Sequence, residues 1–213
     1  MEGAYGFAPK LPAVPKTSTQ HDTARRAQIV AAAAGCFARS GFAATTIPDI
    51  VRGAGLSTGS IYHYFSSKEQ LFLAVVAEYV AVYDEAFFAE LQRPGAPLER
   101  LEAGFVHLQA ELAAQSPARA RIALELWSRA HDVPDLRTWL AEARERRIAA
   151  MVSLLSELCA AGELSPTEVA DGAARLMALA DGLVVQRACA DFAALPGTPL
   201  AAGLRGLLGS GTG

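Results

Sequence analysis

The most constraining feature of the sequence is a glycine-containing turn, Gly53-Ala54-Gly55, set between two short segments with helical signals. Thr46 is a suitable N-cap for the first segment, and Pro48 falls in its first turn, where a missing amide hydrogen does little harm. Because proline has no amide hydrogen, the hydroxyl of Thr46 is expected to bond the amide of Asp49. Ser57 can cap the second segment, so the pattern predicts a helix-turn-helix over roughly residues 46–65.

Longer helical segments are predicted on both sides of this turn. Upstream, apolar residues recur every four positions from Thr23, with Asp22 as the expected N-cap and Gly41 as the expected end. Downstream, Ser67 and Gln70 can form a capping box at the start of a further helix. One face of that helix is expected to carry Leu71, Val75, Tyr79, Tyr83 and Phe87.

The rest of the chain is punctuated by prolines that suit the first turn of a helix. The helices expected there run over Pro97–Gln115, Pro117–His131, Pro134–Ala161, Pro166–Ala190 and Pro199–Leu208. No alternating strand pattern interrupts them, so the predicted fold is all-α with about nine helices. We expect a flexible tail over residues 1–22, a helix-turn-helix domain over 23–68 and a second domain over 69–213.

Composition and charge narrow the possible partners. Apolar residues make up 52% of the chain and no uninterrupted apolar run reaches membrane-spanning length, so we expect a cytoplasmic protein without a membrane segment. Residues 1–68 hold seven basic and three acidic residues, whereas the remainder holds twelve basic and nineteen acidic residues. A basic head on an acidic body fits one end of the molecule contacting phosphate.

Residues 41–71 resemble the DNA-binding region of the TetR family of transcriptional regulators. They read GFAATTIPDIVRGAGLSTGSIYHYFSSKEQL, and the resemblance covers about thirty consecutive residues. It includes the pairs Thr45-Thr46 and Ala54-Gly55 and the single residues Ser57, Gly59, Tyr62, Phe65 and Lys68. One departure lies before Phe65, where the family usually has histidine and this chain has Tyr64.

The resemblance implies a homodimer that binds a roughly palindromic double-stranded DNA operator. Tyr62 and Lys68 are then expected to contact the DNA backbone, and Tyr64 could also donate to a phosphate. Thr58, Ser60 and His63 are the base-reading candidates, because short polar side chains reach base edges directly or through water. Gly59 leaves the backbone free to approach the groove, and the hydroxyls of Thr46 and Ser57 can both cap a helix and bind phosphate.

The same resemblance implies a small-molecule effector, bound among the middle helices, and a dimer interface formed by 166–190 and 199–208. Large or adaptable side chains in the acidic body are the candidates for lining an effector pocket: Phe105, His107, Trp127, His131, Trp139, Met151 and Met177. Each of them could instead fill a helical core. Glu125 and Gln186 would need polar partners if they faced inward. No cofactor is expected.

Two other functions remain open from the sequence. Gly55-Leu56-Ser57-Thr58-Gly59 fits the G-x-S-x-G motif of α/β-hydrolases, but that motif requires a strand before the turn, and none is predicted. A helical binding module without DNA is the other alternative. The chain is therefore not expected to be an enzyme.

The three cysteines, Cys36, Cys159 and Cys189, are far apart in the sequence and do not have the spacing of metal ligands. We therefore expect them to be small buried hydrophobic residues rather than a metal site.

Overall fold

The computed structural model describes residues 20–114 and 116–189, and every regular element in these two ranges is an α-helix. There are eight: α1 (Gln20–Ala44), α2 (Ile47–Ala54), α3 (Thr58–Tyr64), α4 (Lys68–Leu91), α5 (Pro97–Ala114), α6 (Pro117–Ala130), α7 (Pro134–Ala160) and α8 (Pro166–Cys189). The all-α prediction is confirmed. The four helices predicted over 97–190 lie within one residue of their expected ends, and the ninth, Pro199–Leu208, lies outside the described residues.

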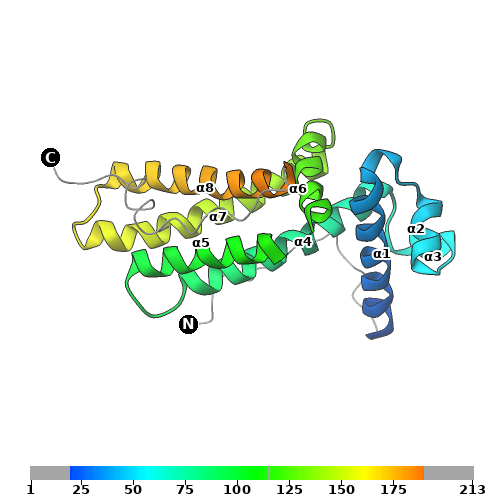
Figure 1. Cartoon of the computed structure of the whole chain (residues 1–213), viewed down its shortest axis with the longest axis horizontal. Coiled ribbons are helices and arrows are strands. Elements are labelled where there is room, and N and C mark those ends of the chain that lie inside the picture. The colour runs from blue at the N-terminus through cyan, green and yellow to red at the C-terminus, as the bar shows by residue number, and fades with distance from the viewer. Residues whose placement is uncertain (1–19, 115, 190–213) are drawn as a thin grey trace.

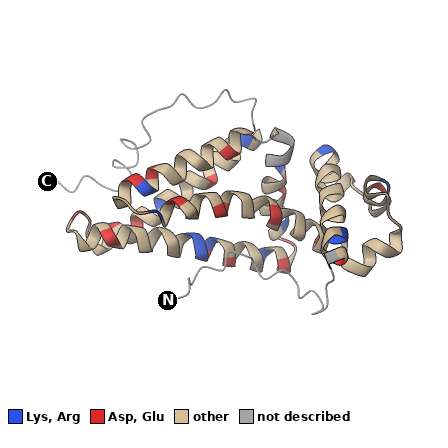
Figure 2. Ribbon diagram, turned by 90° about the horizontal axis from the view of Figure 1, so that it is seen from below, with Lys and Arg blue, Asp and Glu red and all other residues tan. Residues whose placement is uncertain are grey.

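The helices form a small head and a longer body (Figure 1). Helices α1 to α3 make the head, and α4 leads out of it into a bundle in which α4, α5, α7 and α8 run along the body. Helix α6 stands across the bundle beside α1, and it packs on α1, α7 and α8. Both signs of charge are interspersed along the body helices, as Figure 2 shows.

Two hydrophobic clusters hold these parts together. The first fills the head with Ile29, Phe37, Ile50, Ile61 and Phe72, and it continues into the facing sides of α6 and α7. The second fills the bundle with side chains from α4, α5, α7 and α8. The head is thus packed directly on the body rather than tethered by a loop.

Helix α1 differs from the expectation at its start. It begins at Gln20 instead of Thr23, and Asp22 lies in its first turn, where its carboxylate accepts a hydrogen bond from Tyr64 rather than capping the helix. Gly41 marks a kink with φ 74° and ψ 168°, close to the expected end. By length and composition alone His21–Ala44 could cross a membrane, but its apolar side chains Ile29, Val30 and Phe37 are buried in the head.

The face predicted for α4 is confirmed. Leu71, Val75, Tyr79, Tyr83 and Phe87 are all buried. The capping box expected at its start forms only in part, because the amide of Gln70 donates to the Ser67 hydroxyl while the Gln70 side chain donates to Asp135 at 2.7 Å. Gln70 therefore ties α4 to α7 instead of closing the cap.

Candidate nucleic-acid interface and ligand cavity

Helix α2 is held at its first turn by a reciprocal cap. The Asp49 amide donates to the Thr46 hydroxyl oxygen at 3.3 Å, as the sequence predicts, and the Thr46 amide donates back to the Asp49 carboxylate at 2.9 Å. The Thr46 hydroxyl also donates to that carboxylate at 2.6 Å. These hydrogen bonds, together with nearby Arg52, hold the pKa of Asp49 below its usual value.

The turn between α2 and α3 depends on one glycine. Gly55 has φ 65° and ψ 31°, a left-handed conformation that favours glycine, and its amide donates to the Val51 carbonyl. Ser57 then caps α3, because its hydroxyl oxygen accepts from the amide of Ser60 at 3.1 Å. The helix-turn-helix is therefore formed by caps on both helices.

Helix α3 buries one side and exposes the other. Ile61 is fully buried in the head, which fixes the helix on α1 and α2. Thr58, Gly59, Tyr62 and His63 are exposed, with Tyr62 leaving 52% of its surface accessible, and Ser60 is half-buried. The residues predicted to read DNA thus share the accessible side of one helix.

Lys68 and Tyr64 point inward instead. The Lys68 ammonium donates to the carbonyls of Phe42 and Thr45, each at 2.9 Å, and lies 4.2 Å from the centre of the Phe42 ring. The Tyr64 hydroxyl donates to Asp22 at 3.1 Å; partial burial and this hydrogen bond raise the pKa of Tyr64. Both side chains therefore hold the head together, and their contact with DNA stays a prediction.

The G-x-S-x-G match does not form a nucleophile elbow. Residues 55–59 connect two helices, whereas the elbow joins a strand to a helix. The described hydrogen bonds of the Ser57 hydroxyl are both with Ser60, one to its amide and one to its hydroxyl at 2.9 Å. The motif is a coincidence of capping and turn residues.

The body contains a cavity of about 80 Å³ between α4, α6, α7 and α8. Most of its wall is apolar or aromatic, and its principal side chains are Tyr79, Tyr83, Phe87, Trp127, Trp139, Met151 and Met177. Three charged residues also line it: Asp84, Arg147 and Asp181. Apolar walls with a few convergent polar groups are typical of sites for small organic molecules, but such sites usually enclose about 300–1,000 Å³, so this cavity would have to widen to admit one.

The charged residues of the cavity are connected across helices. Arg147 donates to both oxygens of Asp84, at 2.8 and 3.2 Å, and both side chains are mostly buried. Asp181 has a looser contact, 3.4 Å from Arg144. Burial raises the pKa of Asp181, although Arg144 and Arg147 act in the opposite direction.

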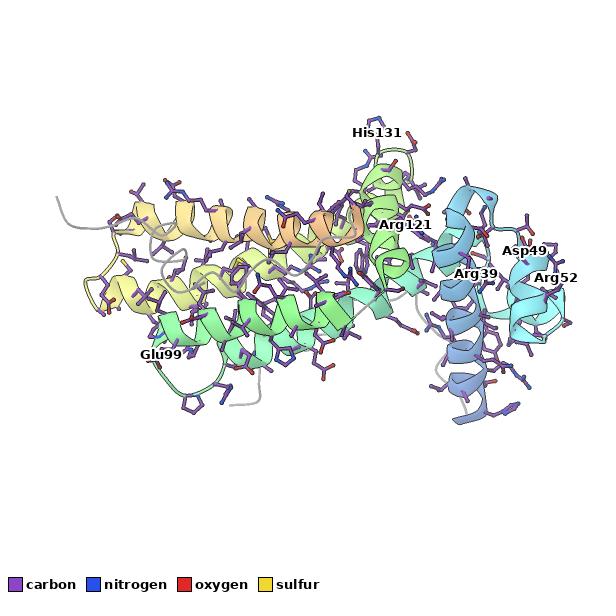
Figure 3. The ribbon with its side chains drawn as sticks, in the orientation of Figure 1. Arg39, Asp49, Arg52, Glu99, Arg121 and His131 are labelled. Carbon is purple, nitrogen blue, oxygen red and sulfur yellow. The ribbon has the colours of Figure 1, made fainter. Side chains whose placement is uncertain are left out.

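The effector candidates divide into two groups. Trp127, Trp139, Met151 and Met177 line the cavity. Three others lie outside it: Phe105 is fully buried beside Phe87, His107 lies between Glu90 and Glu111 at 3.8 and 3.7 Å, and His131 follows α6. Figure 3 shows His131 at the outer end of α6, away from the bundle.

Sequence reasoning missed the charged residues of the cavity. Asp84 interrupts an apolar helix face directly after Tyr83, which is the one local signal that it required a partner. Its partner Arg147 is 63 residues away and belongs to a charge-rich stretch that gave no such signal. Of the two polar residues noted for their orientation, Gln186 is exposed, and Glu125 faces the head, where it accepts from the Phe42 amide.

Comparison with known proteins identifies both parts of the chain. Residues 29–75 match the family described as bacterial regulatory proteins, tetR family, and residues 97–205 match the BetI-type transcriptional repressor C-terminal domain. The chain is 30% identical to the regulator BetI of Agrobacterium fabrum over 162 residues, which covers 76% of each protein. It is 38% identical to the repressor KstR2 of Mycobacterium tuberculosis over 86 residues, 38% of this chain and 41% of KstR2.

Structural comparison agrees with this assignment. Salmonella enterica GusR superimposes with a TM-score of 0.72 at 25% identity, covering 89% of this chain and 97% of GusR. The first five curated relatives, however, are matched over only 30 to 45% of their length. The longer BetI match and the C-terminal domain match extend over the body. The chain therefore belongs to the tetR family of bacterial regulatory proteins, with a C-terminal part of the BetI type.

Proposed function

We propose that this chain is a homodimeric, ligand-responsive transcriptional repressor that binds a palindromic DNA operator and acts in the cytoplasm without catalytic activity. Its relatives support repression, because KstR2 is named as a transcriptional repressor and the matching C-terminal domain is described as one. Helix α8 would contribute to the two-fold interface. The symmetry of the dimer would then place two heads on two half-sites of the operator.

The observation that carries this proposal is the surroundings of Gly59. A Cβ atom at this position would meet nothing closer than the Ser57 hydroxyl oxygen at 3.9 Å, so the folded chain has room for a side chain. Its φ lies outside the left-handed region that favours glycine. Glycine is the poorer choice in an exposed helix. The advantage of glycine at position 59 is that it lets the α3 backbone approach a partner closely, as a recognition helix in a major groove requires.

The exposed side of α3 supplies groups that suit DNA. Thr58, Ser60 and His63 would read base edges, while Tyr62 would donate its hydroxyl to a phosphate. Thr46 and Ser57 lie at the N-terminal ends of α2 and α3, where the helix dipoles also favour phosphate. Lys68 and Tyr64 would act mainly by holding the head in shape, given their internal hydrogen bonds.

The cavity would bind the effector. The solved structure of AibR, which is 19% identical and superimposes with a TM-score of 0.65, is a complex with isovaleryl coenzyme A and operator DNA. Those ligands belong to AibR, and the shared fold is compatible with a regulator that takes both kinds of ligand. An effector relieves repression here only if it binds the DNA-free conformation more tightly than the DNA-bound one.

Gly59→Ala tests the DNA claim, with Gly53→Ala as the matched control. Gly53 also lies in a short head helix, but a Cβ there would face Ala32 and Cys36 of α1 at 3.7 Å. Both changes should leave the head folded, or stabilise it by up to about 1 kcal/mol. Only Gly59→Ala should weaken binding to an operator selected from random DNA. Equal operator affinities for the two variants would refute the proposed interface.

A further inference from the structure

The hydrogen bonds described between head and body gather at the kink in α1, at Phe42 and Thr45. Gly41 has φ 74° and ψ 168°, so the amide of Phe42 leaves the helical hydrogen-bond ladder. The carboxylate of Glu125 on α6 accepts from that amide at 2.7 Å. Its other oxygen lies 2.7 Å from the position that a Cβ on Gly41 would occupy. One carboxylate from the body therefore fits against a kink in the head that has no room for a side chain.

The residue after the kink is held from three directions. Arg129 of α6 lies 3.9 Å from the centre of the Phe42 ring, and Lys68 of α4 lies 4.2 Å from it while donating to the Phe42 carbonyl. Inside the head the Phe42 ring packs on Phe37 and Phe72, with centroids 5.6 and 5.0 Å away. Phe42 is thus the point at which α1, α4 and α6 meet.

The same helix that holds Phe42 also forms a wall of the cavity. Ala123, Leu126 and Trp127 of α6 line the cavity, whereas Glu125, between them in sequence, faces α1. Figure 3 shows α6 standing between the bundle and the head, with Arg39 of α1 and Arg121 of α6 on the two facing helices. Arg39, Gly41, Arg121 and Glu125 line one groove between these helices. A shift of α6 that makes room in the cavity must therefore change the contact at Phe42.

We propose that Glu125 is the positioning residue that couples occupation of the cavity to the orientation of the head. The coupling acts through the hydrogen bond from the Phe42 amide and through the fit of the carboxylate against Gly41. This inference rests on the proposed function only in its last step, from head orientation to operator binding. The transmission from the cavity to Phe42 is a property of the protein alone and can be measured without DNA or effector.

The experiment fills the cavity by mutation and follows the Phe42 amide by hydrogen exchange in the full chain. Ala180 lines the cavity from α8, so Ala180→Trp stands in for an occupant, with Ala180→Leu as a milder version. Each is combined with Glu125→Ala, which removes the acceptor, or with Glu125→Gln, whose amide oxygen can still accept. Glu142→Ala, on the exposed surface of α7, is the control for loss of a body carboxylate.

We expect the cavity-filling change to speed Phe42 exchange several-fold in the wild type and in the Glu125→Gln and Glu142→Ala backgrounds. In Glu125→Ala, exchange should already be fast, and filling the cavity should add less than a twofold change. The inference is overturned if cavity filling leaves Phe42 exchange unchanged in the wild type, or changes it equally with and without Glu125. A folded wild type that shows this coupling but binds no operator would contradict the proposed function and leave the coupling standing.

Discussion

The hydroxyl of Tyr64, the last residue of α3, donates a hydrogen bond to the carboxylate of Asp22 in the first turn of α1, with 3.1 Å between the oxygens. The two residues are 42 positions apart, and the bond joins the end of the exposed helix to the helix that supports it. It gives a structural reason for tyrosine at the position where related sequences usually carry histidine. Ser57 thus stabilises the start of α3, and Tyr64 fixes its end to α1.

Tyr64→Phe should weaken operator binding by a few-fold, because the change removes the hydroxyl while keeping the ring. Asp22→Asn should do less harm, since an amide oxygen can still accept the hydrogen bond. Fluorescence anisotropy with labelled operator DNA measures both effects. If Tyr64 instead contacts phosphate directly, the two changes will act independently, and Tyr64→Phe will have its full effect in an Asp22→Ala background.

Substitutions of Tyr62 and Lys68 should affect different properties, operator affinity for Tyr62 and stability for Lys68. Tyr62→Ala should lower operator affinity and leave the free energy of unfolding nearly unchanged, because its side chain is 52% exposed. Lys68→Ala should cost on the order of 2 kcal/mol of stability, since it removes two charge-assisted hydrogen bonds to carbonyls near the kink of α1. Urea unfolding and DNA titration on the same samples separate the two roles. A Lys68→Ala protein of unchanged stability would contradict the internal role assigned to this lysine.

Gly41→Ala should be destabilising by about 1 to 3 kcal/mol, because its backbone conformation is nearly exclusive to glycine. A second cost comes from the Glu125 carboxylate, which a Cβ would meet at 2.7 Å. Gly162→Ala is the control, with a φ of 77° and nothing within 4 Å. Removing the carboxylate with Glu125→Ala should reduce the cost of Gly41→Ala and leave the cost of Gly162→Ala unchanged. If Gly41→Ala lowered the free energy of unfolding equally in the wild type and in Glu125→Ala, the whole loss would come from backbone strain and none from the carboxylate.

Asp49 and Asp181 should give the unfolding free energy opposite dependences on pH. The pKa of Asp49 is lowered by folding, so its stabilising contribution is present above the unfolded pKa of about 3.9 and is lost as pH falls through the lower folded value. The pKa of Asp181 is raised by burial, so the folded state holds the proton more tightly and loses stability as pH rises from about 3.9 through the higher folded value.

Urea titrations of Asp49→Asn and Asp181→Asn at a series of pH values check these signs. Asp49→Asn should remove part of the acid-induced loss of stability. Asp181→Asn should remove part of the decline that accompanies ionisation, so its stability relative to the wild type should improve as pH rises toward neutrality. If the stability of both variants relative to the wild type changed in the same direction as pH rises, the environments described for these carboxylates would be contradicted.

The head was predictable from sequence because its determinants are local. Thr46 and Ser57 bond to amides three residues ahead, and Gly55 supplies a turn that favours glycine. Such contacts are encoded within one helical turn, so the caps formed by Thr46 and Ser57 were predictable, whereas the cap expected from Asp22 does not form. The inward turn of Lys68 could not be anticipated in this way, because its partner carbonyls lie 23 and 26 residues earlier and are brought near only by packing.

The cavity was less predictable for the same reason. The buried face of α4 followed from its periodicity, and four of the seven effector candidates line the cavity: Trp127, Trp139, Met151 and Met177. Periodicity gives the buried side of a helix but not the residue across from it. The pairing of Asp84 with Arg147, and of Gln70 with Asp135, depends on how helices cross, and this is set by the packing of the whole bundle.

Operator binding by a dimer is tested by a quantitative binding titration of the purified full chain on DNA from upstream of its own gene. The salt concentration is varied, and the number of chains bound is counted by sedimentation. We predict specific binding to a two-fold symmetric site by two chains, with log affinity falling linearly with log salt by about 0.9 per phosphate neutralised. Binding by a single chain, or affinity that is independent of sequence and of Gly59→Ala, would contradict a dimeric regulator that reads DNA through α3.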